Sequence, residues 1–339
     1  MNRIDKWSIL AAVRFLLASV VAVTHLGEFA PLGILSFIPK FGAFESILGF
    51  LLISGYSISV SYTKQPDGFL IRRLKRLYPV YLAAMAVNFV AVLSENGPMP
   101  SVHNLALNAL FLNQLFTSTS FVGPAWSLSL EFWLYCFAPT LMRTSPKWTR
   151  ILVYGSFGCY LIYTALRTLS HVPYYSGIGF GGNLVLLSFA WVAGLRLAQL
   201  HDAPASAMRD IRWLFAGHIA IAVVIQFAYR VKHHSVPGFF NTDLLNYGMQ
   251  SLSLLFVYLV FDRLVIAPRP AVERSWFLRF LGDVSYPLYL LHVPVYTLLR
   301  KAGLTIPVVY YLVAVLASAF VYQALDFYSK KRHQKIGTD

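Results

Sequence analysis

The sequence predicts an all-α protein, a polytopic bundle of about ten transmembrane helices with both termini in the cytoplasm. The chain of 339 residues is 57% hydrophobic and 12% charged, whereas about a quarter of a soluble domain is charged. Many separate apolar runs reach the roughly 17–25 residues that a helix needs to cross a bilayer. Helices are expected because no other open-chain structure satisfies its backbone hydrogen bonds in lipid. We therefore expect one integral-membrane domain over residues 1–339.

Ten apolar runs are candidate spans, and an eleventh is too short to be one. The candidates cover residues 7–29, 43–62, 78–94, 125–142, 151–169, 180–199, 213–229, 244–262, 284–300 and 305–327. The short run 104–116 is expected to be re-entrant or interfacial, because counting it as a span would move most later basic loops outside. With ten spans, most of the 28 Lys and Arg residues face the cytoplasm, as the positive-inside rule requires. The first run lacks a small-residue cleavage site, so no cleavable signal peptide is expected.

The net charge of +14 and the isoelectric point near 9.8 would suggest a nucleic-acid ligand in a soluble protein. In a membrane protein the same excess marks the cytoplasmic loops, so no nucleic-acid partner is expected. Cys136 and Cys159 both lie in apolar runs and indicate neither a disulfide nor a metal site.

The first span carries two ionisable residues, Arg14 and His25. They are eleven residues apart, so on a helix they lie within about 20° of one face and roughly 16 Å apart along the axis. Ionisable residues inside a membrane are costly and suggest a functional site. Alternatively, Arg14 extends to the inner surface and His25 contacts lipid headgroups.

A basic segment precedes the third span and contains Arg72, Arg73, Lys75 and Arg76. Arg73 and Arg76 share a helical face, and Pro79 suits a first helical turn. Paired guanidinium groups suit bidentate capture of phosphate, so a phosphorylated cytoplasmic donor or a lipid headgroup could bind there. The simpler alternative is a topological anchor.

Glu131 lies six residues into the apolar run that begins at Ala125, with no cation nearby in sequence. A neutral carboxyl group facing lipid is possible but costly, so a bundle-facing carboxylate with a cationic partner is the better interpretation. By depth, His25 is the predicted partner, and a carboxylate that orients an imidazole leaves its other nitrogen free as a base.

Two further motifs have both structural and functional interpretations. Ser54-Gly55 in the second span is typical of close helix packing. His292, between Pro287 and Pro294, suggests the wall of a cavity in a kinked helix, although a packed histidine is about as common.

Together these motifs resemble the signature of the acyltransferase family 3 of integral-membrane O-acyltransferases. Five blocks occur in family order: Arg14-(ten residues)-His25, Ser54-Gly-Tyr56, Arg73-x-x-Arg76-Leu-x-Pro79, Trp126-Ser-Leu-x-x-Glu131-x-x-x-Tyr135 and Ser285-Tyr-x-x-Tyr-Leu-x-His292. We expect a stand-alone member, without the extra helix and hydrolase-like domain that some members carry.

The resemblance implies a ten-helix, multi-pass enzyme of the bacterial inner membrane, with no permanently bound cofactor and no metal. Such an enzyme moves an acyl group, usually acetyl, from acetyl-CoA or another acyl-CoA to a hydroxyl group of a glycan or lipid-linked glycan. The catalytic residues are expected to be His25, Glu131 and Arg14, and the donor-binding residues Arg73, Arg76 and Arg72. Residues of the acceptor site or pore are expected to be Trp126, Ser127, Tyr135, Ser54 and His292.

The rival hypothesis is a proton-coupled transporter or flippase in which Glu131, His25 and His292 form a proton relay. The absence of a visible internal repeat disfavours common transporter folds. A structural membrane subunit without chemistry is a third alternative, and the cost of burying Glu131 argues against it.

Overall fold

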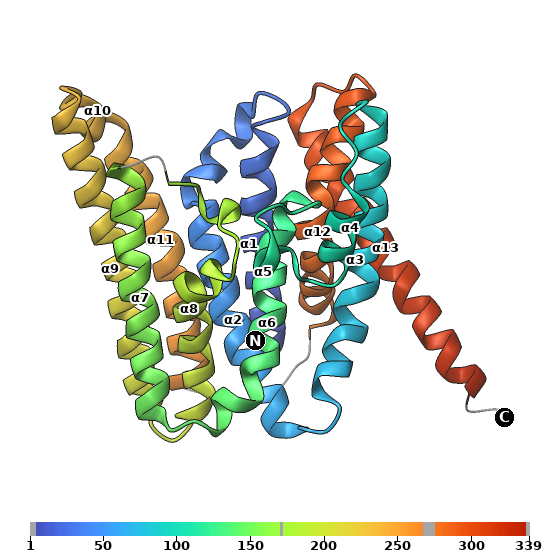
Figure 1. The fold of residues 1–339 in the computed structure, drawn as a ribbon, viewed down its shortest axis with the longest axis horizontal. Coiled ribbons are helices and arrows are strands. Elements are labelled where there is room, and N and C mark those ends of the chain that lie inside the picture. Colours follow the sequence, from blue (N-terminus) through green and yellow to red (C-terminus); the bar gives the residue numbers. More distant parts are fainter. Residues whose placement is uncertain (1–4, 170–171, 267–274, 337–339) are drawn as a thin grey trace.

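The computed structural model describes residues 5–169, 172–266 and 275–336, and in these ranges the chain forms helices and loops without any strand (Figure 1). The all-α prediction is confirmed. Ten long helices in this part of the chain follow the ten predicted spans. They are α1 (Lys6–Leu26), α2 (Ala43–Lys64), α3 (Phe69–Ser94), α6 (Trp126–Arg143), α7 (Pro146–Leu169), α8 (Gly182–Gln199), α9 (Pro204–Lys232), α11 (Leu244–Phe261), α12 (Trp276–Lys301) and α13 (Pro307–Ile336).

Seven helical segments among the described residues are long and apolar enough to cross a membrane. These contain α1, α2, α3, α8, α9, α11 and the described apolar part of α13. Short helices join the long ones: η1 (Gly33–Phe41), α4 (Val102–Ala109), α5 (Asn113–Phe116), η2 (Gly123–Ala125), η3 (Tyr175–Gly177), α10 (Val236–Gly238), η4 (Phe239–Asp243) and η5 (Asp262–Ile266).

Helix α3 begins earlier than the hydropathy predicts. It starts at Phe69, so Pro79 lies in the interior of the helix and not in its first turn. The basic residues that precede the apolar run are therefore already helical, and Arg73 and Arg76 project from one face of α3. Hydropathy alone could not find this start, because four basic residues interrupt the apolar residues in the first turns of α3.

Helices α2 and α8 approach each other closely at two glycines. A Cβ atom at Gly55 would lie 1.9 Å from the carbonyl oxygen of Trp191, and one at Gly194 would lie 2.1 Å from that of Leu52. Only glycine allows this backbone distance, which is the small-residue packing expected between membrane helices. The close packing predicted for Ser54-Gly55 is thus confirmed, and it brings α8 against the polar residues of α2.

The segment between α3 and α6 folds into the bundle and forms no spanning helix, because α4 has eight residues and α5 has four. Asn108 is fully buried, where its side chain bonds the Phe121 amide and its carbonyl accepts from Tyr81. The Phe111 carbonyl accepts from Ser129 and Trp133 of α6. Figure 1 shows this segment and the start of α6 within the bundle, below the upper ends of α3 and α12.

The loops after α2, α6 and α8 lie together at the lower end of the bundle in Figure 1. We call this the basic end, because it carries Lys64, Arg143, Lys147 and Arg209. The clustering agrees with the predicted charge asymmetry, while its assignment to the cytoplasm stays a prediction. The two chain ends, at residues 1–4 and 337–339, lie outside the described residues.

Candidate active site

A cavity of about 620 Å³ lies between α1, α2, α3, α6 and α12 and reaches the basic end of the bundle. We call it the central cavity. Five basic side chains line it, against two acidic ones. The basic residues are Arg14, Lys64, Arg73, Arg76 and Arg279, and the acidic residues are Glu131 and Asp283. Its electrostatic field therefore favours an anionic ligand.

Two arginines of the cavity are held by neutral hydroxyl groups. Arg14 donates to the Ser57 hydroxyl at 3.0 Å, and Arg73 donates to the Ser61 hydroxyl. The buried Nε of Arg73 has no partner. Since Ser57 and Ser61 do not neutralise these charges, both guanidinium groups keep their charge for a ligand. The serine spacing along α2, at positions 54, 57 and 61, was the sequence signal for this face, and our sequence reasoning missed it.

Arg76 has an acidic partner, Asp283 of α12, with Nη2 3.5 Å from Oδ1. The pair is largely exposed at the mouth of the cavity, where ion pairs contribute little to stability. A stronger anion can therefore take Asp283's place beside Arg76.

Arg72, which was predicted to bind the donor together with Arg73 and Arg76, lies apart from them. Its guanidinium donates to the carbonyl groups of Gln65 and Asp67 in the α2–α3 loop, and it does not line the cavity. The reason is helical spacing, because adjacent residues point about 100° apart. Arg72 therefore stabilises the loop, while Arg73 and Arg76 face the cavity.

Glu131 points into the cavity and is bound by hydroxyl groups. Its Oε1 accepts from Ser54 and from Tyr135, one turn further along α6. Trp191 of α8 donates to the Ser54 hydroxyl at 3.3 Å, so the α2–α8 contact positions this cluster. Glu131 also lies close enough to Arg14 to interact with it electrostatically.

The predicted pairing of Glu131 with His25 was wrong. The prediction assumed that the fourth span begins at the outer surface, so that both residues share one depth. Since α6 begins inside the bundle (Figure 1), Glu131 lies deeper and shares the cavity with Arg14.

His25 pairs instead with His292 of α12. The Nδ1 of His25 lies 3.0 Å from the Nε2 of His292, and the two rings stack with centroids 5.1 Å apart. His292 is fully buried, and its Nδ1 lies 2.9 Å from the Leu288 carbonyl oxygen. A carbonyl only accepts, so the Nδ1 of His292 carries the proton and its Nε2 accepts from the Nδ1–H of His25. This pattern leaves the Nε2 of His25 with a free lone pair, which a general base requires.

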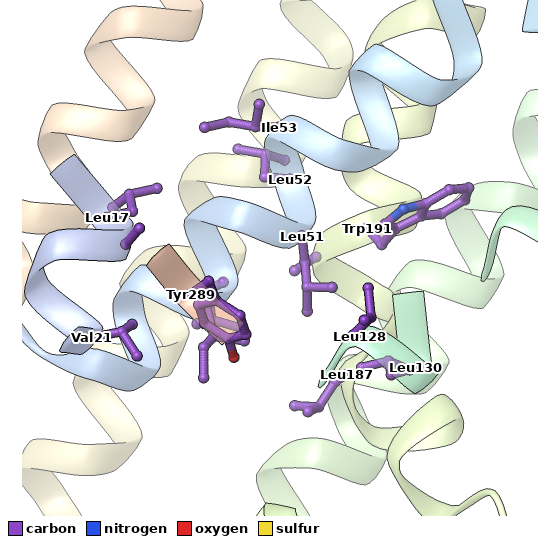
Figure 2. Close-up of a cluster of buried hydrophobic side chains, with 14 of the residues drawn as sticks. Leu17, Val21, Leu51, Leu52, Ile53, Leu128, Leu130, Leu187, Trp191 and Tyr289 are labelled. Carbon is purple, nitrogen blue, oxygen red and sulfur yellow. The ribbon is translucent and has the colours of Figure 1, made fainter. Parts of the chain in front are cut away.

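Tyr289 and Ser127 separate the central cavity from the histidine pair. Their hydroxyl oxygens are 2.7 Å apart, and both side chains line the cavity. The Tyr289 ring belongs to the same buried cluster as Leu17, Val21 and Leu51 (Figure 2), and it contacts His292 edge-on at 6.4 Å. His25 and His292 are not among the cavity-lining residues, so the pair lies one turn beyond its closed end.

The remaining predicted acceptor or pore residues divide into two groups. Ser127 and Tyr135 line the cavity. Ser54, Trp126 and His292 are buried and do not line it. Among the described residues no cluster of three or more potential metal ligands exists.

Comparison with known proteins identifies the family of the chain. A family model described as an acyltransferase domain matches residues 7–325. The chain belongs to this family. It is thus a membrane-embedded, multi-pass protein of an acyltransferase family, and the family prediction from the sequence motifs is confirmed.

Three relatives share 23–24% identity with the chain. A putative acetyltransferase of Acidianus two-tailed virus aligns over 76% of this chain and 73% of its own length. The peptidoglycan O-acetyltransferase OatA of Listeria monocytogenes aligns over 84% of this chain and 50% of its own. A putative membrane-bound acyltransferase of Bacillus subtilis, YfiQ, aligns over 72% and 66%. The chain thus spans half of OatA and about two thirds of YfiQ. No solved structure matches the chain.

Proposed function

We propose that the protein is an O-acetyltransferase of the bacterial inner membrane that moves an acetyl group from acetyl-CoA to a hydroxyl group of an exported or cell-surface glycan. The proposal rests on the relative position of the central cavity and His25. A cavity with five basic side chains opens at the basic end, and a histidine with a free Nε2 lies just beyond its closed end. The similarity to a peptidoglycan O-acetyltransferase supports acetyl as the acyl group and a glycan as the acceptor.

In the proposed complex, Arg73 and Arg76 bind the phosphates of CoA at the mouth. Bidentate guanidinium–phosphate contacts are strong and directional, and the phosphates displace Asp283 from Arg76. The pantetheine arm extends along the cavity past Arg14, which fixes a polar part of the donor, to Ser127 and Tyr289. Transfer then requires the Tyr289–Ser127 contact to open, so that the thioester reaches His25.

His25 acts as the general base. Its Nε2 takes the proton of the acceptor hydroxyl while the hydroxyl oxygen attacks the thioester carbonyl carbon. The C–S bond breaks, and the departing sulfur of CoA takes the proton from His25, so the products are the acetyl ester and free CoA. His292 holds His25 in the required tautomer, and general-base catalysis of this kind contributes about 10²–10⁴-fold. Glu131 supplies negative charge beside Arg14 and shapes that part of the cavity through Ser54 and Tyr135.

The transporter hypothesis needs Glu131, His25 and His292 in one proton relay. His25 and His292 are within hydrogen-bond distance of each other, but Glu131 is bound to Ser54 and Tyr135. This separation favours the enzyme.

The test is release of free CoA from acetyl-CoA by the purified protein supplied with candidate glycan acceptors. We expect His25→Ala to lower release about 10²–10⁴-fold while the melting temperature stays near that of the wild type. His201→Ala is the matched control, because the side chain of His201 is 72% exposed beside Asp202, and it should release CoA at the wild-type rate. Equal rates in wild type and His25→Ala would refute the catalytic role of His25, and gradient-driven transport without CoA release would establish the rival.

A further inference from the structure

A second groove, lined by basic and apolar residues, lies at the basic end, between α7, the end of α8 and the start of α9. It has a volume of about 780 Å³, and we call it the α7–α9 groove. Lys147, Arg150 and Tyr154 line it from α7, Arg196 from α8 and Ser206 from α9. None of these residues belongs to the central cavity, so the transfer mechanism does not use them.

The charges around the groove are unbalanced. No acidic residue lines it, whereas Lys147, Arg150 and Arg196 do. The nearby carboxylate, Asp210, is almost fully buried and already binds Arg196 at 3.1 Å and Arg150 at 3.0 Å. One carboxylate between two guanidinium groups leaves a positive charge, to which Lys147 adds a second. The Nε of Arg196 is buried and has no partner, so this guanidinium is incompletely satisfied.

The start of α9 adds a further attraction for anions. Its N-cap residue is Ala203, which cannot accept from the first-turn amides, and the first turn holds no acidic residue. Pro204 has no N–H group, and the Ser206 amide donates to the Ala203 carbonyl at 3.3 Å, so the N-terminus of this 29-residue helix offers mainly the positive end of the helix dipole. Ser206, in this first turn, lines the groove, so the helix end and the three cations face the same space. Such an end binds phosphate and similar anions readily.

The surroundings of the groove point to a lipid as the source of the anion. Trp148, on the same turn of α7, is 60% exposed, and Trp213 of α9 is 59% exposed. Exposed tryptophans near helix ends mark the membrane–water interface. Beyond the cations the wall becomes apolar, with Ile151, Gly155 and Leu200. A charged pocket at headgroup depth that continues into an apolar surface matches a phospholipid better than a free anion.

We propose that the α7–α9 groove binds the phosphate headgroup of an anionic glycerophospholipid. Lys147, Arg150 and Arg196 surround the phosphate at the positive end of α9, and the acyl chains follow the exposed surface of α7. This site is independent of the transfer reaction, and its occupancy would fix the ends of α7, α8 and α9 relative to one another.

The critical variant is Ser206→Asp, which places a negative charge in the groove. Asp in the first turn of a helix is favourable for the helix itself, so loss of lipid binding in this variant would not reflect unfolding. Ala205→Asp is the matched control, because it adds the same charge in the same turn but does not line the groove. Lys147→Gln tests the attraction directly, with Arg209→Gln as the control for loss of one exposed cation at the same end.

The experiment is native mass spectrometry of the detergent-purified protein with phosphatidylglycerol, phosphatidylcholine or inorganic phosphate. We expect the wild type to retain phosphatidylglycerol over phosphatidylcholine, and Ser206→Asp to lower this retention by about tenfold or more. Lys147→Gln should lower it severalfold, and the two controls should resemble the wild type. Three results would each overturn the proposal: no preference for phosphatidylglycerol in the wild type, equal losses in Ser206→Asp and Ala205→Asp, or displacement of the lipid by millimolar inorganic phosphate, which would indicate a site for free anions.

Discussion

Buried charges are satisfied differently in two parts of this bundle. Around the central cavity, Arg14, Arg73 and Glu131 are held by the hydroxyl groups of Ser57, Ser61, Ser54 and Tyr135. Between α8 and α9 a buried charge meets an opposite charge, because Arg196 pairs with Asp210 at 3.1 Å.

These two ways of satisfying a buried charge correspond to different roles, ligand binding in the cavity and stability in the ion pair. A hydroxyl group orients a charge without neutralising it, so the charge stays available to a ligand. In a buried ion pair the two charges neutralise each other, and removing one member leaves an uncompensated charge. We therefore expect substitutions in the cavity to affect activity, and substitutions in the ion pair to affect folding.

The largest effect is expected on stability, from Asp210→Ala. This change leaves Arg196 buried without a counter-charge, and breaking a buried pair in this way costs about 3–5 kcal/mol. Thermal unfolding in detergent measures the loss, with Asp202→Ala as the control because its side chain is 92% exposed. Glu131→Gln, the cavity counterpart, should unfold close to the wild-type temperature. Equal destabilisation by Asp210→Ala and Glu131→Gln would abolish the distinction between the two regions.

The second largest effect is expected on the rate of catalysis, when His292, the partner of His25, is replaced. His292→Ala removes the acceptor of the Nδ1–H of His25, so we expect kcat for acetyl transfer to fall by about 10²-fold, within the range for loss of general-base catalysis. His292→Gln supplies an amide oxygen as acceptor and should recover part of the rate. If both variants keep wild-type kcat per folded molecule and only unfold more easily, His292 has a structural role alone.

A smaller effect is expected from Ser57→Ala, which frees Arg14 from its neutral partner. One hydrogen bond is lost, so stability should change by about 1 kcal/mol and the affinity for acetyl-CoA should fall by less than about tenfold. Ser59→Ala is the control, because Ser59 bonds the backbone of the same helix but does not line the cavity. The role of Ser57 would be refuted if Ser59→Ala weakened donor binding equally.

Much of this fold follows from the sequence. The apolar runs predict all ten long helices, because hydropathy reports where the chain can lie in lipid. The same signal misses the start of α3 by nine residues, since Phe69 and not Tyr78 begins the helix. The four basic residues in its first turns lower the mean hydropathy to that of a loop.

The sequence motifs identified residues of the site, but they did not predict which of these residues contact one another. The motifs identified Arg14, Arg73, Arg76 and Glu131, and all four line one cavity. The partner of His25 could not be predicted, because His292 is 267 residues away and the sequence does not say which helices are neighbours. Depth estimated from the sequence was a poor guide to the partner, because α6 begins inside the bundle and not at its surface (Figure 1).

Binding of a non-transferable thioether analogue of acetyl-CoA tests the central claim most directly. The double variant Arg73→Gln/Arg76→Gln removes two cations from the cavity, and Arg72→Gln/Lys75→Gln removes two from the same segment of α3 outside it. We expect the first to weaken binding by about 100-fold or more and the second by less than about threefold. Equal losses in the two double variants, or no binding by the folded wild-type protein, would contradict the central cavity as the acyl-CoA site.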